Sequence, residues 1–219
     1  MGTPSDHPLR RLLLDAAAGR FPPADLGVEV LPPPPGRADA VVAFSAHNVI
    51  AAAVDPEEVR AHLPAGDPAA PMSAPFLAWL GTRLGSPPGA LDVVLVAPTA
   101  ANTDLRLRPA GRARAHRRVQ RALRYRSDVR VYRDEDGRGV VILGRGLAGR
   151  LEVAIEVDPR ARGRGLGTAL ARAAASVPRG EEPLFAQVSP GNVASLRAFL
   201  AAGYRPVCSE VLFLRAGQR

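Results

Sequence analysis

Three glycines alternate with other residues in the stretch Arg162-Gly-Arg-Gly-Leu-Gly167, directly before an apolar pattern with helical spacing. The stretch follows an apolar run that ends in Val157-Asp-Pro159, so it lies between a predicted strand and a predicted helix. Glycine lets the backbone approach a ligand because it has no Cβ, and the first amides of a helix have no partner inside the helix. These features together predict a loop that binds an anion such as a diphosphate.

The spacing of the glycines excludes two common nucleotide sites. A dinucleotide-binding fold carries Gly-x-Gly-x-x-Gly after an N-terminal strand, and a P-loop ends in Gly-Lys-Ser or Gly-Lys-Thr. This chain has no such glycine run at an N-terminal strand, and it contains no lysine. Nicotinamide-dependent oxidoreductase chemistry and P-loop kinase chemistry are therefore not expected.

The residues around the glycines resemble a known family. The stretch Glu152-Val-Ala-Ile-Glu-Val-Asp-Pro-Arg-Ala-Arg-Gly-Arg-Gly-Leu-Gly167 is similar to the acyl-CoA-binding motif of the GNAT acetyltransferase superfamily. A second run, Asn192-Val-Ala-Ser195 with Phe199 and Gly203-Tyr204 after it, resembles the next motif of that family. The two motifs stand in the family's order, and the resemblance extends over residues 91–219.

The resemblance implies a site for acetyl-CoA, or another acyl-CoA, as co-substrate. It places the pyrophosphate on the backbone amides of Arg162 to Thr168, and it places pantetheine along an open strand edge, where a backbone N–H would hold the thioester oxygen. The implied cofactor-binding residues are Ile155, Glu156, Val157, Arg162, Gly163, Arg164, Gly165, Leu166, Gly167, Thr168, Asn192, Ser195 and Phe199.

The resemblance also implies acyl transfer to an amine by direct attack in a ternary complex. An alkylamine with a pKa of about 10.4 is almost fully protonated at neutral pH, so a general base is needed. Glu152 and Glu156 share one face of a strand because side chains alternate, and Asp158 follows them. We take Glu156 as the first candidate base and Glu152 as the second. The alternative for both is a solvated carboxylate on a half-exposed strand.

One residue departs from the family's pattern. Many members carry a tyrosine seven residues after the motif asparagine, where it protonates the leaving thiolate, and this chain has Phe199 there. Ser195 or Tyr125 could replace that acid, or the thiolate could leave unprotonated. A second reading follows, in which the domain is an acyl-CoA-binding or sensor module with weak catalysis.

The spacing of apolar residues predicts the elements that position these groups. After a strand at 93–96 and a helix at 113–126, strands are expected at 128–133, 140–143 and 151–157. Helices at 166–177 and 193–202 then alternate with a strand at 184–188, and a strand pair closes the chain at 204–214. The predicted fold class is α/β (α+β), with a mixed, mainly antiparallel central sheet, helices on both faces, and a small N-terminal α/β extension.

Proline-rich stretches divide the chain into three predicted parts. Residues 1–36 form a helix and a proline-rich linker, residues 37–90 form an N-terminal extension, and residues 91–219 form the GNAT-like domain. Within the extension, two apolar runs that flank His47-Asn48 predict a hairpin.

Composition limits the partners and the compartment. The chain has 219 residues with 29 basic against 21 acidic side chains, and every basic residue is arginine, which gives a net charge of +8. A single Cys208 excludes a CxxC metal site, no histidine pair has metal-ligand spacing, and no apolar run is long enough for a membrane span. We therefore expect a cytoplasmic protein without a metal, whose partner is a small-molecule or peptide amine. The arginines also allow an RNA-directed or aminoacyl-tRNA-directed transferase, which the sequence does not favour, and a homodimer is compatible with the sequence.

Overall fold

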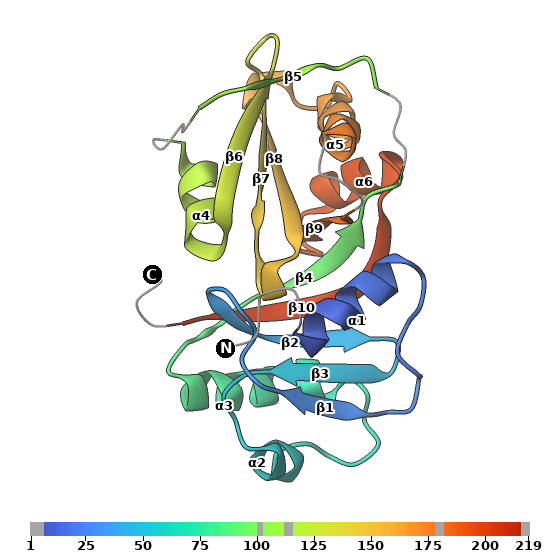
Figure 1. Ribbon diagram of the computed structural model, residues 1–219, viewed down its shortest axis with the longest axis vertical. Coiled ribbons are helices and arrows are strands. Elements are labelled where there is room, and N and C mark those ends of the chain that lie inside the picture. Colours follow the sequence, from blue (N-terminus) through green and yellow to red (C-terminus); the bar gives the residue numbers. More distant parts are fainter. Residues whose placement is uncertain (1–6, 100–102, 112–115, 178–181, 216–219) are drawn as a thin grey trace. The chain divides into compact units, whose positions relative to one another are not determined.

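The computed structural model describes residues 7–99, 103–111, 116–177 and 182–215, and the chain divides into two compact units. Unit 1 contains Met1–Val93, Leu147–Gly149 and Val207–Arg219, and unit 2 contains Val94–Gly146 and Arg150–Pro206. Both units combine strands with helices (Figure 1).

Unit 1 is a sheet with helices and an apolar core. Its helical elements are α1 (Pro8–Ala17), α2 (Pro56–Ala61), η1 (Ala70–Met72), α3 (Ala74–Leu84) and the short turn η2 (Leu147–Gly149). Its strands are β1 (Val28–Leu31), β2 (Ala38–Phe44), β3 (His47–Ala51), the first part of β4 (Pro88–Val96) and nearly all of β10 (Arg205–Leu214). The strand order is β1-β3-β2-β10-β4, with β1 parallel to β3 and with β2 antiparallel to both β3 and β10.

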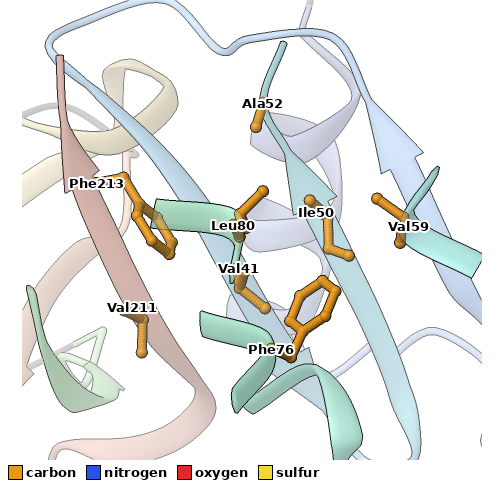
Figure 2. Close-up of a cluster of buried hydrophobic side chains, with 8 residues drawn as sticks. All are labelled: Val41, Ile50, Ala52, Val59, Phe76, Leu80, Val211 and Phe213. Carbon is orange, nitrogen blue, oxygen red and sulfur yellow. The ribbon is translucent and has the colours of Figure 1, made fainter. Parts of the chain in front are cut away.

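The core of unit 1 joins residues from both ends of the chain (Figure 2). Phe76 and Leu80 lie one turn apart on α3, and Val211 and Phe213 lie two residues apart on β10, so each pair shares one face of its element. The buried side chains of this cluster are Val41, Ile50, Ala52, Val59, Phe76, Leu80, Val211 and Phe213. The C-terminal strand is thus part of the core of unit 1, whereas the predicted boundaries assign it to the domain at 91–219.

Unit 2 carries the motif residues. Its elements are the end of β4, β5 (Leu107–Pro109), α4 (Arg117–Tyr125), β6 (Ser127–Asp134), β7 (Gly139–Arg145), β8 (Leu151–Val157), η3 (Pro159–Ala161), α5 (Leu166–Ser176), β9 (Leu184–Val188) and α6 (Val193–Ala201). The strand order is β4-β9-β8-β7-β6-β5. β5, β6, β7 and β8 pair antiparallel in succession, whereas β8 and β9 are parallel.

Helices cover both faces of the sheet in unit 2. Val119 and Ala122 of α4 pack against Val131, Val140 and Ile142, with Ala154 of β8 beside them. The opposite face meets α5, because a Cβ on Gly139 would lie 2.5 Å from Leu170 Cδ1. Figure 1 shows α4 on one side of β6, β7 and β8, and α5 with α6 on the other.

The predicted α/β class and the mainly antiparallel arrangement are confirmed, and two local predictions are wrong. The tight turn of the β2–β3 hairpin lies at Ser45-Ala46 and not at His47-Asn48, with Ala46 in the left-handed region at φ 52°. Residues 205–214 form one strand and not a pair. The strand β1, which has four residues and only one buried side chain, was not predicted from the sequence.

Candidate functional site

The predicted anion loop opens helix α5 as expected. Gly163 and Gly165 adopt φ values of 73° and 79°, which an L side chain rarely takes, and a Cβ on either would meet no atom within 4 Å. Gly165 is the residue before the first helical position, and no side chain caps the helix there. The backbone therefore bends at open positions directly before the first amides of α5.

The first amides of α5 are placed to receive an anion. The intrahelical ladder begins with Ala169 N donating to Gly165 O, so the amides of Leu166, Gly167 and Thr168 precede it. Leu166, Gly167 and Thr168 are half-buried, whereas Arg162, Gly163, Arg164 and Gly165 are exposed. Arg162 Nε also donates to the Val157 carbonyl at 3.3 Å, which holds that arginine near the end of β8.

The edge of β8 that faces β9 is paired only at its beginning. The parallel register runs from Leu151↔Leu184 to Val153↔Ala186, although β8 continues to Val157 and β9 to Val188. The implied pantetheine residues Ile155, Glu156 and Val157 therefore lie beyond the last registered pair with β9. On its other edge β8 stays paired with β7 as far as Gly139↔Val157.

An arginine of α4 reaches this part of β8. Arg118 Nη2 donates to the carbonyl of Ile155 at 3.0 Å. Arg118 is half-buried and stands one residue before the buried Val119 of α4. The implied pantetheine segment thus has a guanidinium on one of its carbonyl oxygens.

Glu152 lies in a buried ion-pair cluster. Its carboxylate accepts from Arg126 Nε at 2.8 Å and from Arg150 Nε at 2.9 Å, and its side chain is 3% exposed. Arg126 Nη2 also donates to Gln187 Oε1 at 2.9 Å, and the Arg150 guanidinium lies 5.4 Å from the centre of the Phe185 ring. The cluster therefore links the end of α4 to strands β8 and β9.

Burial raises the pKa of Glu152, but the charges of Arg150 and Arg126 and hydrogen bonds from Gln187 and Arg150 outweigh it. The net effect holds the pKa of Glu152 below the ordinary value of a glutamate. A carboxylate with a lowered pKa and two guanidinium partners is a weak base. This environment argues against the base role predicted for Glu152.

Glu156 lies on the same face of β8 as Glu152 and Ala154, in a different environment. It is half-buried, and it lies beyond the last registered pair with β9. On the other edge of β8 it is paired with Val140 of β7. Its carboxylate is thus positioned on the strand segment that the resemblance assigns to the acyl-CoA thioester.

The second motif divides between a helix cap and the core. Asn192 caps α6, since its Oδ1 accepts from Ser195 N at 3.2 Å. Phe199 is 3% exposed and packs edge-on against Tyr204 with 4.9 Å between ring centres. Tyr204 is 2% exposed and donates its hydroxyl to Ala171 O at 3.1 Å, as expected for a core residue. The Phe199 ring is therefore not exposed for the contact with the cofactor that the resemblance implies.

The residues that surround Glu152 were not predicted from the sequence. Arg126 and Gln187 stand 26 and 35 positions from Glu152, so no local spacing joins them to it, whereas Arg150 stands only two positions away. The one local signal is the Gly144-Arg-Gly146 run, because a Cβ on Gly146 would overlap the Glu152 carboxylate.

Within the described ranges, no group of three His, Cys, Asp or Glu side chains could hold a metal ion. In the same part of the chain, none of the helices has the length and apolar character needed to cross a bilayer.

The match to a family model lies mainly in unit 2. Residues 110–204 match the model of the acetyltransferase (GNAT) family, and comparison with curated proteins gave no match. A GNAT-family acetyltransferase from Colwellia psychrerythraea is 13% identical, with a TM-score of 0.38 over 65% of this chain and 63% of that chain. A GCN5-related N-acetyltransferase from Kribbella flavida is 18% identical, with a TM-score of 0.42 over 67% of this chain and 66% of that chain. The matched part is thus less than two thirds of each of these chains. The family match bears out, over residues 110–204, the resemblance seen in the sequence.

Proposed function

We propose that this protein transfers an acetyl or short acyl group from acyl-CoA to an amine by direct attack in a ternary complex. The observation that carries the proposal is the combination, in the part of the chain that matches this family, of an open glycine loop at the start of α5 with an unpaired β8 edge. The loop can hold a diphosphate, and the strand edge can pair with an arm that contains amides. CoA contains both of these groups.

The chain's own groups divide the work in this proposal. The amides of Leu166 to Thr168 and the positive end of α5 bind the pyrophosphate. The end of a helix stabilises a negative charge by about 0.3 to 1 kcal/mol at exposed sites. Acyl-CoA supplies the activated acyl group. A β8 amide between Ile155 and Val157 holds the thioester oxygen, where one such donor is worth roughly a hundredfold to a thousandfold in rate.

Glu156 is the proposed general base. It takes the proton from the ammonium form of the acceptor, directly or through a water molecule, so that the neutral amine can attack. Glu152 lies on the same face of β8 as Glu156, and two arginines hold its carboxylate in place. We therefore propose it as a positioning residue and not as a base.

A second candidate function rests on Phe199. Its ring carries no hydroxyl, and the neighbouring Tyr204 hydroxyl is engaged with the Ala171 carbonyl. A domain that binds acyl-CoA as a sensor, with slow transfer, is therefore the alternative. Of the predicted replacements for the acid, Ser195 is half-buried and Tyr125 lies under the Arg121 guanidinium.

Calorimetric titration of the purified protein with acetyl-CoA tests the proposal, with dephospho-CoA as the comparison ligand for the 3'-phosphate. We expect micromolar binding that is lost in Gly165→Asp, since a carboxylate beside the first amides of α5 would repel the diphosphate. Release of thiol with a panel of amines then separates the transferase from the sensor. Absence of acetyl-CoA binding by the folded protein would overturn both.

A further inference from the structure

Arg126 crosses three strands of unit 2 on the face covered by α4. It follows the last residue of α4, and its stem passes over Gly144 of β7, where an added Cβ would lie 3.1 Å from Arg126 Cβ. Its guanidinium then donates to Glu152 of β8 and to Gln187 of β9. Gln187 is the next residue after the last registered β8–β9 pair, so the guanidinium lies where the two strands part.

Two glycines make room for this arrangement. Gly144 accommodates the Arg126 stem, and Gly146 accommodates the Glu152 carboxylate, since a Cβ there would lie 2.2 Å from its carboxylate atoms. Glu152 and Gln187 in turn fix Nε and Nη2 of the guanidinium. The orientation of Arg126 is therefore determined by its surroundings.

The remaining nitrogen of this guanidinium has no hydrogen-bond partner in the part of the chain that the structure describes. Arg126 is 8% exposed, and its Nη1 is buried without a hydrogen-bond acceptor among the described residues. A buried donor left unsatisfied is costly, and hydrogen bonds from a guanidinium to an ionised acceptor are among the strong ones. The unpartnered Nη1 thus matches an anionic acceptor such as a carboxylate.

We propose that Arg126 binds a carboxylate of the substrate at the point where β8 and β9 part. The inference rests on the proposed acyl transfer, and it names the class of substrate: one that carries a carboxylate besides its reacting group. Gln187 and Glu152 act as positioning residues, because they hold the guanidinium in the orientation in which Nη1 has no partner among the described residues.

The carboxylate has two chemical sources, the acyl group or the acceptor. A dicarboxylic monoacyl group would place it at the far end of the acyl chain. An amino acid acceptor would carry the carboxylate at the other end of the molecule from its amine. Glu152, which contacts Arg126, and Glu156 are four residues apart on β8, which at 3.3 Å per residue is about 13 Å. On the acceptor side, longer ω-amino acids should therefore span from Arg126 toward Glu156 better than glycine does.

Matched substrate pairs test the proposal on the full-length protein. Succinyl-CoA is compared with butyryl-CoA, which has the same chain length without the carboxylate. Glycine, β-alanine, 4-aminobutyrate and 6-aminohexanoate are compared with the alkylamines of equal length. We expect at least tenfold higher kcat/KM for the carboxylate member in one of the two series, and the series that responds identifies the source.

Variants assign the preference to Arg126. In Arg126→Gln the ratio between carboxylate and neutral substrates should fall to within about twofold. Arg126→Lys keeps a charge beside Glu152 if the first variant fails to fold, and it should also lose most of the ratio because lysine lacks the planar fork. Arg124→Gln removes an exposed arginine of the same helix and should leave the ratio unchanged.

The proposal can fail separately from the proposed function. If acetyl-CoA binds but both ratios stay within threefold, or if a ratio persists in Arg126→Gln, the carboxylate site is wrong and acyl transfer stands. If acetyl-CoA does not bind, direct calorimetric titration with succinate and 4-aminobutyrate decides whether the carboxylate site exists. Binding lost in the Arg126 variant supports the site, and no binding by the wild-type protein overturns it.

Discussion

At the scale of single residues, two carboxylates of one strand face have opposite environments. Glu152 is buried between two arginines, whereas Glu156 is half-buried beyond the last registered β8–β9 pair. Environment decides which carboxylate can exchange a proton at neutral pH. We therefore propose a structural role for Glu152 and proton transfer for Glu156, and each proposal has its own test.

Glu152→Gln should destabilise the protein at neutral pH by about 3 to 5 kcal/mol, since it leaves buried guanidinium groups without their carboxylate. The folded-state pKa of Glu152 is lowered, so its stabilising effect is complete above the ordinary pKa of a glutamate and is lost as the pH falls further. The difference between wild type and variant should therefore shrink below that pH. Urea unfolding measured from pH 7 to pH 3 checks this.

The control for that prediction is Glu135→Gln, which removes an exposed carboxylate paired with Arg108. Exposed ion pairs contribute about 0 to 1 kcal/mol, so this variant should unfold almost like the wild type. Equal stability losses in the two variants would contradict the buried-cluster argument.

Glu156→Gln should lower the rate of acyl transfer by about 10² to 10⁴ while acetyl-CoA affinity stays within threefold of wild type. The reason is that the amide cannot accept a proton but occupies nearly the same volume. Single-turnover kinetics beside calorimetry separates the two quantities. An unchanged rate would remove Glu156 from the mechanism.

The sequence predicted the shared face of the two carboxylates but not their environments. Alternation along β8 places Glu152 and Glu156 on one side, because that depends only on neighbouring residues. The burial of Glu152 depends on Arg126 and Gln187, which folding brings from another helix and another strand. Periodicity carries no information on such distant partners.

At the scale of elements, the start of α5 depends on backbone conformation more than on side chains. Gly165 precedes the first helical residue at φ 79°, and no side chain caps the helix. Local spacing was sufficient to predict this helix start and the helix that follows Asn192. It was insufficient for the β2–β3 turn, since Ala46 adopts a left-handed conformation that alanine seldom takes.

Gly165→Ala tests the role of this backbone bend. An alanine at positive φ costs about 1 to 2 kcal/mol, and relief of that strain should shift the first amides of α5. We expect at least tenfold weaker acetyl-CoA binding by calorimetry. Gly66→Ala carries the same strain at φ 75° in unit 1, outside this loop, and should lose stability without losing acetyl-CoA affinity.

At the scale of the whole chain, the first 93 residues and the last strand form one unit. Phe213 of β10 is fully buried, in a cluster with Val41, Phe76 and Leu80. The cluster was not predictable from the sequence, because the apolar pattern at 204–214 fits a strand in either part of the chain. Phe213→Ala should lower the free energy of unfolding by about 3 to 5 kcal/mol, measured by denaturant titration. Phe21 is 48% exposed, so Phe21→Ala should change the free energy of unfolding by less than about 0.5 kcal/mol.

A fragment of residues 91–219 tests the domain boundary predicted from the sequence. The fragment keeps β10 but lacks β2, the strand that pairs with Ser209 to Leu214, and it lacks α3. Val211 and Phe213 would then lose the apolar partners that bury them in unit 1. We expect the fragment to bind a hydrophobic dye and to aggregate at concentrations where the full chain stays dispersed, because an unpaired apolar strand edge promotes association. A well-dispersed fragment that binds acetyl-CoA as tightly as the full chain would instead mean that β10 does not need unit 1, and that the predicted boundary near residue 91 marks an independent domain.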